Sequence, residues 1–166
     1  VFQKGGLFDS MNVYDNIAFG VRRLGRNESA VEKSVLSALE RVGLAGSEQK
    51  LPSELSGGMQ KRVGLARAVC MQPQVIFYDD PTAGLDPLLT DSIALLLNEI
   101  RQRDGITSIA ITHDLVFAQK IADSIILLEK GRMLCHLSRD EFFSGHDEAA
   151  RQFMEGLEDG PIRVFE

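Results

Sequence analysis

The sequence lacks the features that would place it within a membrane or outside the cell. None of its 166 residues belongs to an apolar run near the roughly 18 residues that a membrane-spanning helix needs. No secretory signal is recognisable. Only two cysteines are present, Cys70 and Cys135, far apart and in apolar contexts. This spacing favours buried reduced thiols over a disulfide and predicts a reducing compartment.

Positive charge is also scarce. The 18 Lys and Arg against 24 Asp and Glu give a formal charge of -6, and the pI is about 5.1. This balance excludes nucleic-acid binding driven by overall charge. The hydrophobic content of 44% and charged content of 25% are typical of a soluble globular protein, long enough for one domain with a core.

The first 70 residues contain helical patterns separated by loop-like segments. Apolar residues recur at helical spacing, which predicts amphipathic helices. Gly43 is a plausible stop for the second helix. We expect helices over residues 11–24, 31–42 and 58–70.

The remainder alternates between short apolar runs and helical patterns. The runs are rich in β-branched residues, and their alternation with helices predicts an α/β fold with a mostly parallel sheet covered on both faces. "KGR" (130–132) reads as a hairpin turn, and 159–166 as an extended tail. Strands are expected over 75–79, 107–112 and 124–130, and helices over 88–103, 115–122 and 147–154.

The stretch "LSGGMQ" (55–60) begins a helix with residues that form helices poorly. Ser56 can cap the helix, while Gly57 and Gly58 leave its first turn bare. The free backbone N–H groups and the positive end of the helix dipole then form an anion site. An ordinary capped helix after a loop remains the alternative.

Two acids follow the buried strand of "VIFYDD" (75–80). Ligands of parallel sheets bind at the carboxyl ends of the strands, where Asp79 and Asp80 must emerge. One carboxylate there can hold Mg²⁺, and the next can orient or deprotonate an attacking water. "IAITHD" ends another strand at His113, which should reach the same edge. A strand that merely ends in an acidic turn is the alternative.

Together these residues resemble the ATP-binding cassette (ABC) ATPases. "LSGGMQ" is similar to the signature motif, "VIFYDD" to the Walker B strand, "AGLD" (83–86) to the D-loop and His113 to the switch histidine. Gln3 falls where the family has its Q-loop glutamine. The resemblance implies a P-loop NTPase-type (RecA-like) α/β fold with a helical subdomain. It divides the chain into that subdomain (about 5–72), part of the catalytic core (73–135) and a C-terminal extension (136–166).

Within the family, the sequence most resembles the Mla-type ATPases, which energise lipid transport with Mce-domain partners. The similar stretches are "GGLFDSMNVYDNIAFGVR" after Gln3 and "RQFMEGLEDGPI" near the end. The resemblance implies a homodimer, a permease whose coupling helix meets residues 5–24, and Mce-domain and STAS-domain partners. It implies no nucleic-acid partner and a peripheral position on the cytoplasmic face of the inner membrane.

The resemblance also implies roles for single residues around ATP and Mg²⁺. Ser56, Gly57 and Gly58, with Gln60 beside them, would meet the γ-phosphate of the nucleotide held by the partner cassette. The remaining roles concern the metal, the attacking water and the dimer interface. Asp79 would help hold Mg²⁺, Gln3 would sense the metal and the water, His113 would contact the γ-phosphate, and Asp86 would cross the interface.

One departure from the family lies at Asp80, where the general base is usually a glutamate. An aspartate retracts the carboxylate by about 1.5 Å, and misplacement of about 1 Å can cost on the order of 100-fold in rate. We therefore expect slow but nonzero hydrolysis in an intact cassette.

A second departure is the absence of the phosphate loop G-x-x-x-x-G-K-[ST]. In the family this Walker A loop precedes the Q-loop, so the chain resembles a cassette that is incomplete at its N-terminus. The Walker A strand would lie between the strands that match 107–112 and 124–129. We expect these 166 residues alone neither to bind ATP tightly nor to hydrolyse it.

Several readings stay open. The shared motifs do not name the cargo, so another ABC importer or exporter is the main alternative to lipid transport. A DNA-repair member would need a long coiled coil between Gln3 and Ser56, where only 52 residues lie. A non-catalytic remnant is a further alternative. Lys61, Arg62 and Arg67 are expected to form a solvated helix face.

Overall fold

The computed structural model describes residues 1–3 and 5–162. The chain forms two compact units, Val1–His113 and Asp114–Glu166. Part of the extended tail expected over 159–166 lies outside the described residues. The subdomain boundaries expected from the sequence stay a prediction. Among the described residues, no helix combines the length and apolarity needed to cross a membrane.

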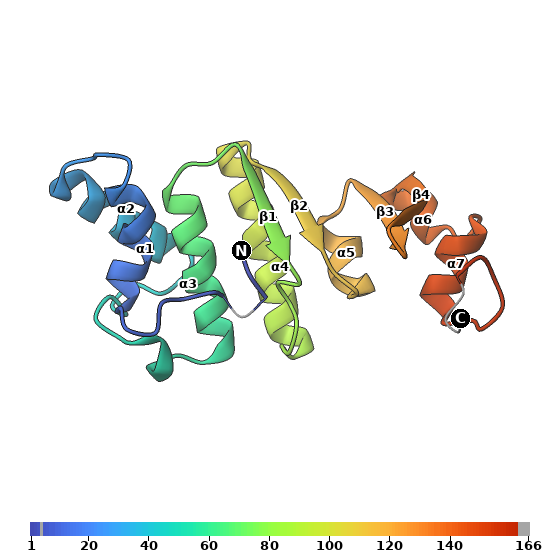
Figure 1. The fold of residues 1–166 in the computed structure, drawn as a ribbon, viewed down its shortest axis with the longest axis horizontal. Coiled ribbons are helices and arrows are strands. Elements are labelled where there is room, and N and C mark those ends of the chain that lie inside the picture. Colours follow the sequence, from blue (N-terminus) through green and yellow to red (C-terminus); the bar gives the residue numbers. More distant parts are fainter. Residues whose placement is uncertain (4, 163–166) are drawn as a thin grey trace. The chain divides into compact units, whose positions relative to one another are not determined.

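The first unit begins with helices that pack on one another (Figure 1). A parallel strand pair and a long helix follow them along the chain. The elements are α1 (Val13–Arg22), α2 (Glu28–Arg41), the 3₁₀ turn η1 (Pro52–Glu54), α3 (Gly57–Cys70), β1 (Val75–Asp79), α4 (Pro87–Asp104) and β2 (Thr107–Ile111).

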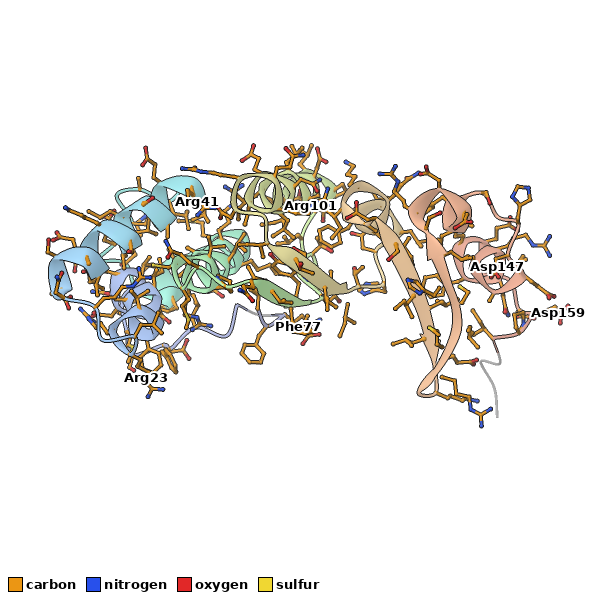
Figure 2. The ribbon with its side chains drawn as sticks, turned by 90° about the horizontal axis from the view of Figure 1, so that it is seen from above. Arg23, Arg41, Phe77, Arg101, Asp147 and Asp159 are labelled. Atoms are coloured by element: carbon orange, nitrogen blue, oxygen red, sulfur yellow. The ribbon has the colours of Figure 1, made fainter. Side chains whose placement is uncertain are left out.

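The β1–β2 pair confirms the parallel strands and the α/β class. β1 and β2 run in register from Val75 opposite Thr107 to Asp79 opposite Ile111. Ile76 and Tyr78 are buried in the core, and α4 lies along one face of the pair (Figure 1). Phe77 points the other way and is 63% exposed, as Figure 2 shows. Within the described residues, helix cover therefore reaches only one face of this pair.

The second unit is a hairpin with short helices. β3 and β4 pair antiparallel, joined by Lys130 and Gly131, both with positive φ, as a two-residue hairpin of type I′ requires. The predicted hairpin turn is thus confirmed. The elements are α5 (Leu115–Ile121), β3 (Ser124–Glu129), β4 (Arg132–Ser138), α6 (Arg139–Phe143) and α7 (Glu148–Glu155).

β2 and β3 share no ladder among the described residues, which form two separate strand pairs. The single sheet expected from the sequence is therefore not formed by these strands alone. The expectation that another strand separates β2 from β3 stays a prediction.

Short polar side chains fix where the α-helices begin. Asn12 accepts a hydrogen bond from the Asp15 N–H at the start of α1, and Asn27 accepts one from Ala30 at the start of α2. Such caps satisfy backbone donors that the first turn leaves open. Ser56, Asp86, Asp114, Ser138 and Asp147 act in the same way for the later helices.

Asn16 is a fully buried amide that holds the loop before α1. Its Oδ1 accepts from the Phe8 N–H at 2.8 Å, and its Nδ2 donates to the carbonyls of Phe8, Met11 and Asn12. In the second unit, Gln152 of α7 bonds both the N–H and the C=O of Ile162. Each buried amide thus orders an irregular segment beside its helix.

We expect Asn16→Leu to destabilise the first unit, because it removes the partner of the Phe8 N–H and of the Met11 carbonyl, whereas the Phe8 and Asn12 carbonyls keep backbone donors. Each unsatisfied buried group costs about 1–3 kcal/mol. Urea denaturation followed by circular dichroism measures the loss, with the exposed Gln102→Leu on α4 as control. A midpoint equal to that of the control would contradict this role for the amide.

Both cysteines are free and buried, which confirms the prediction of reduced thiols. Burial raises the pKa of the Cys70 thiol to about 11, from the ordinary value of 9.0. The neutral thiol therefore contributes its full stabilisation below pH 9, and that contribution is lost as the pH rises toward 11.

We expect native Cys70 to resist alkylation, because the thiolate is the reactive form. At the ordinary thiol pKa of 9.0, the folded thiolate fraction should be about 50-fold below that of the unfolded chain. Iodoacetamide labelling at that pH, followed by peptide mass spectrometry with and without urea, measures the ratio. Equal rates in the two conditions would show that the thiol is accessible.

Candidate functional site

Asp79 and Asp80 lie where the sequence predicted, at the carboxyl end of β1. Asp79 is the last residue of the strand and its side chain is exposed. Asp80 follows with φ 42°, a conformation that few residues other than glycine adopt and that often marks functional sites. Its N–H donates to the Ile111 carbonyl at 2.8 Å. The turn after β1 is therefore anchored on β2.

The structure brings Asp80 and His113 together. His113 Nδ1 lies 3.1 Å from Asp80 Oδ2, and the side chains are 78% and 13% exposed. The other carboxylate oxygen of Asp80, Oδ1, is buried with no hydrogen-bond partner among the described residues. A buried carboxylate oxygen without a donor is uncommon and calls for an explanation.

Gln3 reaches the same edge by a different route. The Val1 nitrogen donates to the Phe77 carbonyl at 2.6 Å, and the Asp79 N–H donates to the Val1 carbonyl at 2.9 Å. This is the hydrogen-bond pattern of a parallel strand beside β1. Gln3, which is exposed, follows Val1 toward the edge that carries Asp79 and Asp80.

The start of α3 forms a second group. Ser56 Oγ accepts from the Met59 N–H at 3.3 Å. A Cβ at Gly57 would meet nothing within 4 Å, and one at Gly58 would make only ordinary contact with Leu89 at 3.6 Å. Neither glycine has positive φ. Packing and backbone conformation within the chain therefore do not require these two glycines.

Asp86 lies at the start of α4, beside this second group. Its Oδ1 accepts from the N–H groups of Leu88 and Leu89, both at 2.9 Å. Since Leu89 is the residue nearest to Gly58, the starts of α3 and α4 are neighbours. Asp86 thus joins the group of Ser56, Gly57 and Gly58.

Gln60 is turned away from the helix start. Its Nε2 donates to the Pro52 carbonyl at 2.9 Å and is 3.5 Å from that of Leu55. The amide therefore holds the loop that leads into α3. A contact of Gln60 with a nucleotide stays a prediction.

The expectation of a solvated basic face on α3 was wrong. Lys61 is only 8% exposed and donates to the carbonyls of Pro81 and Ala83. Arg62 donates to the Val42 carbonyl and to Ser92, and Arg67 donates to the Gly5 carbonyl at 3.1 Å. Each cation ties α3 to a different segment, because α3 is covered on several sides.

The electrostatics at Lys61 involve the candidate site directly. Burial lowers the pKa of Lys61, and the nearby Asp80 carboxylate opposes that shift. The buried ammonium thus lies within the electrostatic reach of the Asp80 charge.

A close contact between two glycines was also missed by sequence reasoning. A Cβ at Gly64 would lie 2.8 Å from the Gly5 carbonyl oxygen, and one at Gly5 would lie 2.8 Å from that of Gln60. The segment after Gln3 therefore rests directly on α3. The available signal was Gly64 itself, since a glycine inside a helix is costly and often marks a close approach.

The carboxylates fit a metal that arrives with its own ligands. The described residues contain no group of three or more His, Cys, Asp or Glu side chains that could hold an ion. Mg²⁺ is usually bound by one or two carboxylates together with substrate phosphates. The exposed carboxylate of Asp79 and the unpartnered oxygen of Asp80 suit that mode of binding.

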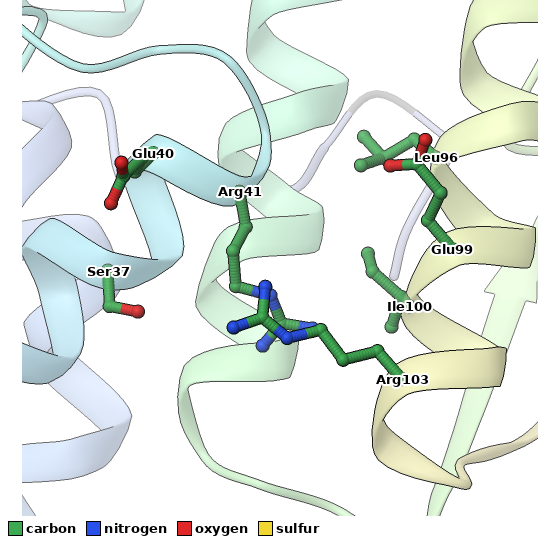
Figure 3. Close-up of a pocket in the computed structure, with 7 residues that line it drawn as sticks. All are labelled: Ser37, Glu40, Arg41, Leu96, Glu99, Ile100 and Arg103. Atoms are coloured by element: carbon green, nitrogen blue, oxygen red, sulfur yellow. The ribbon is translucent and has the colours of Figure 1, made fainter.

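A hollow of about 380 Å³ lies between α2 and α4, away from both groups (Figure 3). Arg41 and Arg103 reach into it with Glu40 and Glu99 nearby, and Arg41 also pairs with Asp104. Its charges are balanced and it contains no predicted site residue, so we leave it outside the candidate site.

Comparison with known proteins places these features in one family. The sequence profile of the family described as "ABC transporter" matches residues 1–83, which is half of the chain. The "Probable ribonucleotide transport ATP-binding protein mkl" of Mycobacterium leprae (strain TN) is 38% identical over 167 aligned positions. The alignment covers 100% of this chain and 48% of that protein.

A second relative is named for lipid transport. The "Intermembrane phospholipid transport system ATP-binding protein MlaF" of Escherichia coli (strain K12) is 36% identical over 163 aligned positions, covering 98% of this chain and 61% of that protein. The chain therefore spans about half to three fifths of the length of these relatives.

The fold has a solved counterpart as well. The structure of cbiO1 from Clostridium perfringens, described as part of the ABC transporter complex cbiONQ, matches with a TM-score of 0.80 and 35% identity. The match covers 87% of this chain and 58% of that one. With the family profile and these relatives, it shows that the chain belongs to the ABC transporter family.

Proposed function

We propose that the complete protein containing this chain is the ATP-hydrolysing subunit of an ABC transporter that moves phospholipid between membranes. The observation that carries the proposal is the Asp80–His113 contact at the end of β1, 3.1 Å long, beside an exposed Asp79. The 36% identity to MlaF of Escherichia coli supports phospholipid as the cargo.

In this proposal, the edge of β1 carries the hydrolytic chemistry. Mg²⁺ supplies charge neutralisation on the phosphates, and Asp79 is the residue that would hold it. Asp80 is the residue that would accept the proton of the attacking water; its Oδ2 is engaged by His113 and its Oδ1 is buried without a partner. His113, largely exposed, presents the rest of its ring to the nucleotide. Gln3 follows the strand beside β1 to the same edge.

The start of α3 serves a second copy of the chain. Its bare turn offers backbone N–H groups to an anion, and neither glycine there is required by the chain's own packing. We infer a head-to-tail homodimer in which Ser56, Gly57 and Gly58 meet the nucleotide of the partner. Asp86 lies beside them, where it can cross the interface.

The remaining partners follow from the same proposal. The complex would contain a permease that meets residues 5–24, with Mce-domain and STAS-domain proteins. The ATPase would lie at the cytoplasmic face of the inner membrane. The aromatic pair Phe8 and Phe19, 4.8 Å apart, and the hollow beside it lined by Met11 and Arg23 offer a surface for such a contact.

A second cargo is favoured by one observation. The relative from Mycobacterium leprae is 38% identical and carries a name that refers to ribonucleotide transport. An ATPase of another ABC importer or exporter is therefore the second candidate, and the site chemistry would be the same.

The test is reconstitution of the complete reading frame with its permease. We expect the protein to co-purify with the permease and to hydrolyse ATP. We also expect phospholipid transfer between vesicles that stops with a non-hydrolysable ATP analogue. Hydrolysis stimulated by ribonucleotide without lipid transfer would favour the second candidate. A protein that purifies without a permease would contradict both.

A further inference from the structure

Lys61 is a buried lysine that contacts the turn after β1. It is 8% exposed, and its Nζ lies 3.0 Å from the Pro81 carbonyl and 2.6 Å from the Ala83 carbonyl. Lysine is almost never this buried unless its ammonium is compensated. Here two backbone carbonyls of one short segment provide that compensation.

That segment is the turn 80–86, which joins β1 to α4. It begins with Asp80 and ends with Asp86, and two bonds fold it on itself. The Ala83 N–H donates to the Asp80 carbonyl at 3.2 Å, and the Leu85 N–H donates to the Thr82 carbonyl at 3.0 Å. Lys61 is bonded at the middle of this turn, so it holds the turn against α3.

Lys61 also lies one helical turn after the bare start of α3. Residues three apart on a helix share a face, so Lys61 follows Gly58 on the same side. Asp80 and the start of α3 are therefore connected through a single side chain. In the head-to-tail dimer these two groups serve different nucleotides.

We propose that Lys61 is a positioning residue that clamps the turn 80–86 to α3, so that the two half-sites of one chain move together. This inference rests on the proposed function. Through the Lys61 ammonium, the turn 80–86 would move with α3. A shift of α3 when the partner's nucleotide binds would therefore also move Asp80 and Asp86. The nearby Asp80 carboxylate favours a cation at this place.

Substitutions that remove or keep the Lys61 donors test the clamp. Lys61→Met keeps the unbranched shape and most of the length of the side chain but leaves the Pro81 and Ala83 carbonyls without their Lys61 donor. Lys61→Arg keeps the charge and the donors. Lys33→Met, on the exposed face of α2, is the matched control, because it removes the same charge from a side chain without a hydrogen bond or ion pair to any other described residue.

The first experiment measures steady-state ATP hydrolysis of the complete protein with its permease. We expect Lys61→Met to lower kcat about 10- to 100-fold, the scale of misplacing a catalytic group by up to 1 Å, while KM stays close to that of the wild type. The Hill coefficient for ATP should fall toward unity. Lys61→Arg should recover most of kcat, and Lys33→Met should match the wild type.

The second experiment measures backbone hydrogen exchange and needs no activity. We expect faster exchange at Ala83 and Leu85 in Lys61→Met, with exchange in the body of α3 unchanged. Unchanged exchange at these amides, or a kcat equal to that of the control, would overturn the clamp. Global loss of protection across α3 would also overturn it, because Lys61 would then act on the fold as a whole.

The two experiments separate this inference from the proposed function. A wild-type protein without ATP hydrolysis would contradict the proposed function, and the exchange result would still decide the clamp. Normal hydrolysis in Lys61→Met would contradict the clamp and leave the proposed function in place.

Discussion

Replacing Asp80 by asparagine is expected to lower the kcat of ATP hydrolysis by about 10²- to 10⁴-fold, the contribution of a positioned general base. An amide cannot take the proton of the attacking water. Its oxygen can still accept from His113 Nδ1, now 3.1 Å from Oδ2, so the fold of the edge should survive. The loss should therefore appear in kcat, with ATP binding retained.

The measurement is phosphate release by the complete protein at saturating Mg²⁺ and ATP, with nucleotide affinity determined separately. Asp159→Asn makes the same change in charge at an exposed residue of the second unit and is the control. A variant at Asp80 that keeps the wild-type rate would show that another group takes the proton.

Asp80→Glu tests the same residue in the opposite direction, because it lengthens the side chain and should raise the rate. Aspartate is shorter than the family's usual glutamate by one methylene, about 1.5 Å. If the short reach limits the rate, Asp80→Glu should hydrolyse ATP faster than the wild type. An unchanged or lower rate would mean that the turn 80–86 already brings the carboxylate to its working position.

The elements that carry this edge were predictable because each has a local signal. β1 and β2 are short apolar runs rich in β-branched residues, and the structure gives them as Val75–Asp79 and Thr107–Ile111. The two acids after β1 and His113 after β2 then had to reach the same edge of a parallel pair. Their direct contact was not predicted, because it also requires β1 and β2 to be neighbours in the sheet, which only the structure shows.

The role of α3 could not be predicted in the same way. Helical periodicity identifies an apolar stripe, but it cannot say what covers the other faces. Lys61, Arg62 and Arg67 therefore looked like a solvated face, whereas each donates to backbone carbonyls of a distant segment. Only the tertiary fold determines which cations are buried and which carbonyls they meet.

Among the short features, one was missed and one was predicted. α6 (Arg139–Phe143) is too short to show a helical period, although its capping box of Ser138 and Glu141 is visible in the sequence. The hairpin of β3 and β4, in contrast, was predicted from "KGR" (130–132), because its turn has a local signal. The parallel pairing of β1 with β2 depends on contacts between segments that the local pattern does not encode.

Replacing Gly57 by aspartate is expected to abolish most ATP hydrolysis without harming the fold. The position is exposed, its φ is not positive, and a Cβ there meets nothing within 4 Å. A carboxylate in the first turn of a helix is itself favourable by about 0.3–1 kcal/mol. The melting temperature should therefore stay the same or rise slightly.

The expected functional loss has an electrostatic cause. The new carboxylate would occupy the place expected for the partner's γ-phosphate at the N-terminus of α3. The two negative charges would repel each other there, although the positive end of the helix dipole attracts either one alone. We expect kcat to fall at least about 100-fold, the scale of losing one charge-stabilising donor. Ser53→Asp adds the same charge just before α3 and is the control. A Gly57→Asp protein with normal hydrolysis would show that no anion binds at the start of α3.

Mixing the two inactive proteins tests whether the site is shared between chains. In a head-to-tail dimer, each nucleotide meets Asp80 of one chain and Gly57 of the other. A mixed dimer of Asp80→Asn with Gly57→Asp then has one site with both defects and one site with neither, so part of the wild-type rate should return. If Asp80 and Gly57 of the same chain met one nucleotide, every site in the mixture would carry one defect and no activity would return. Recovery on mixing would therefore explain why α3 begins with two glycines that its own chain does not need.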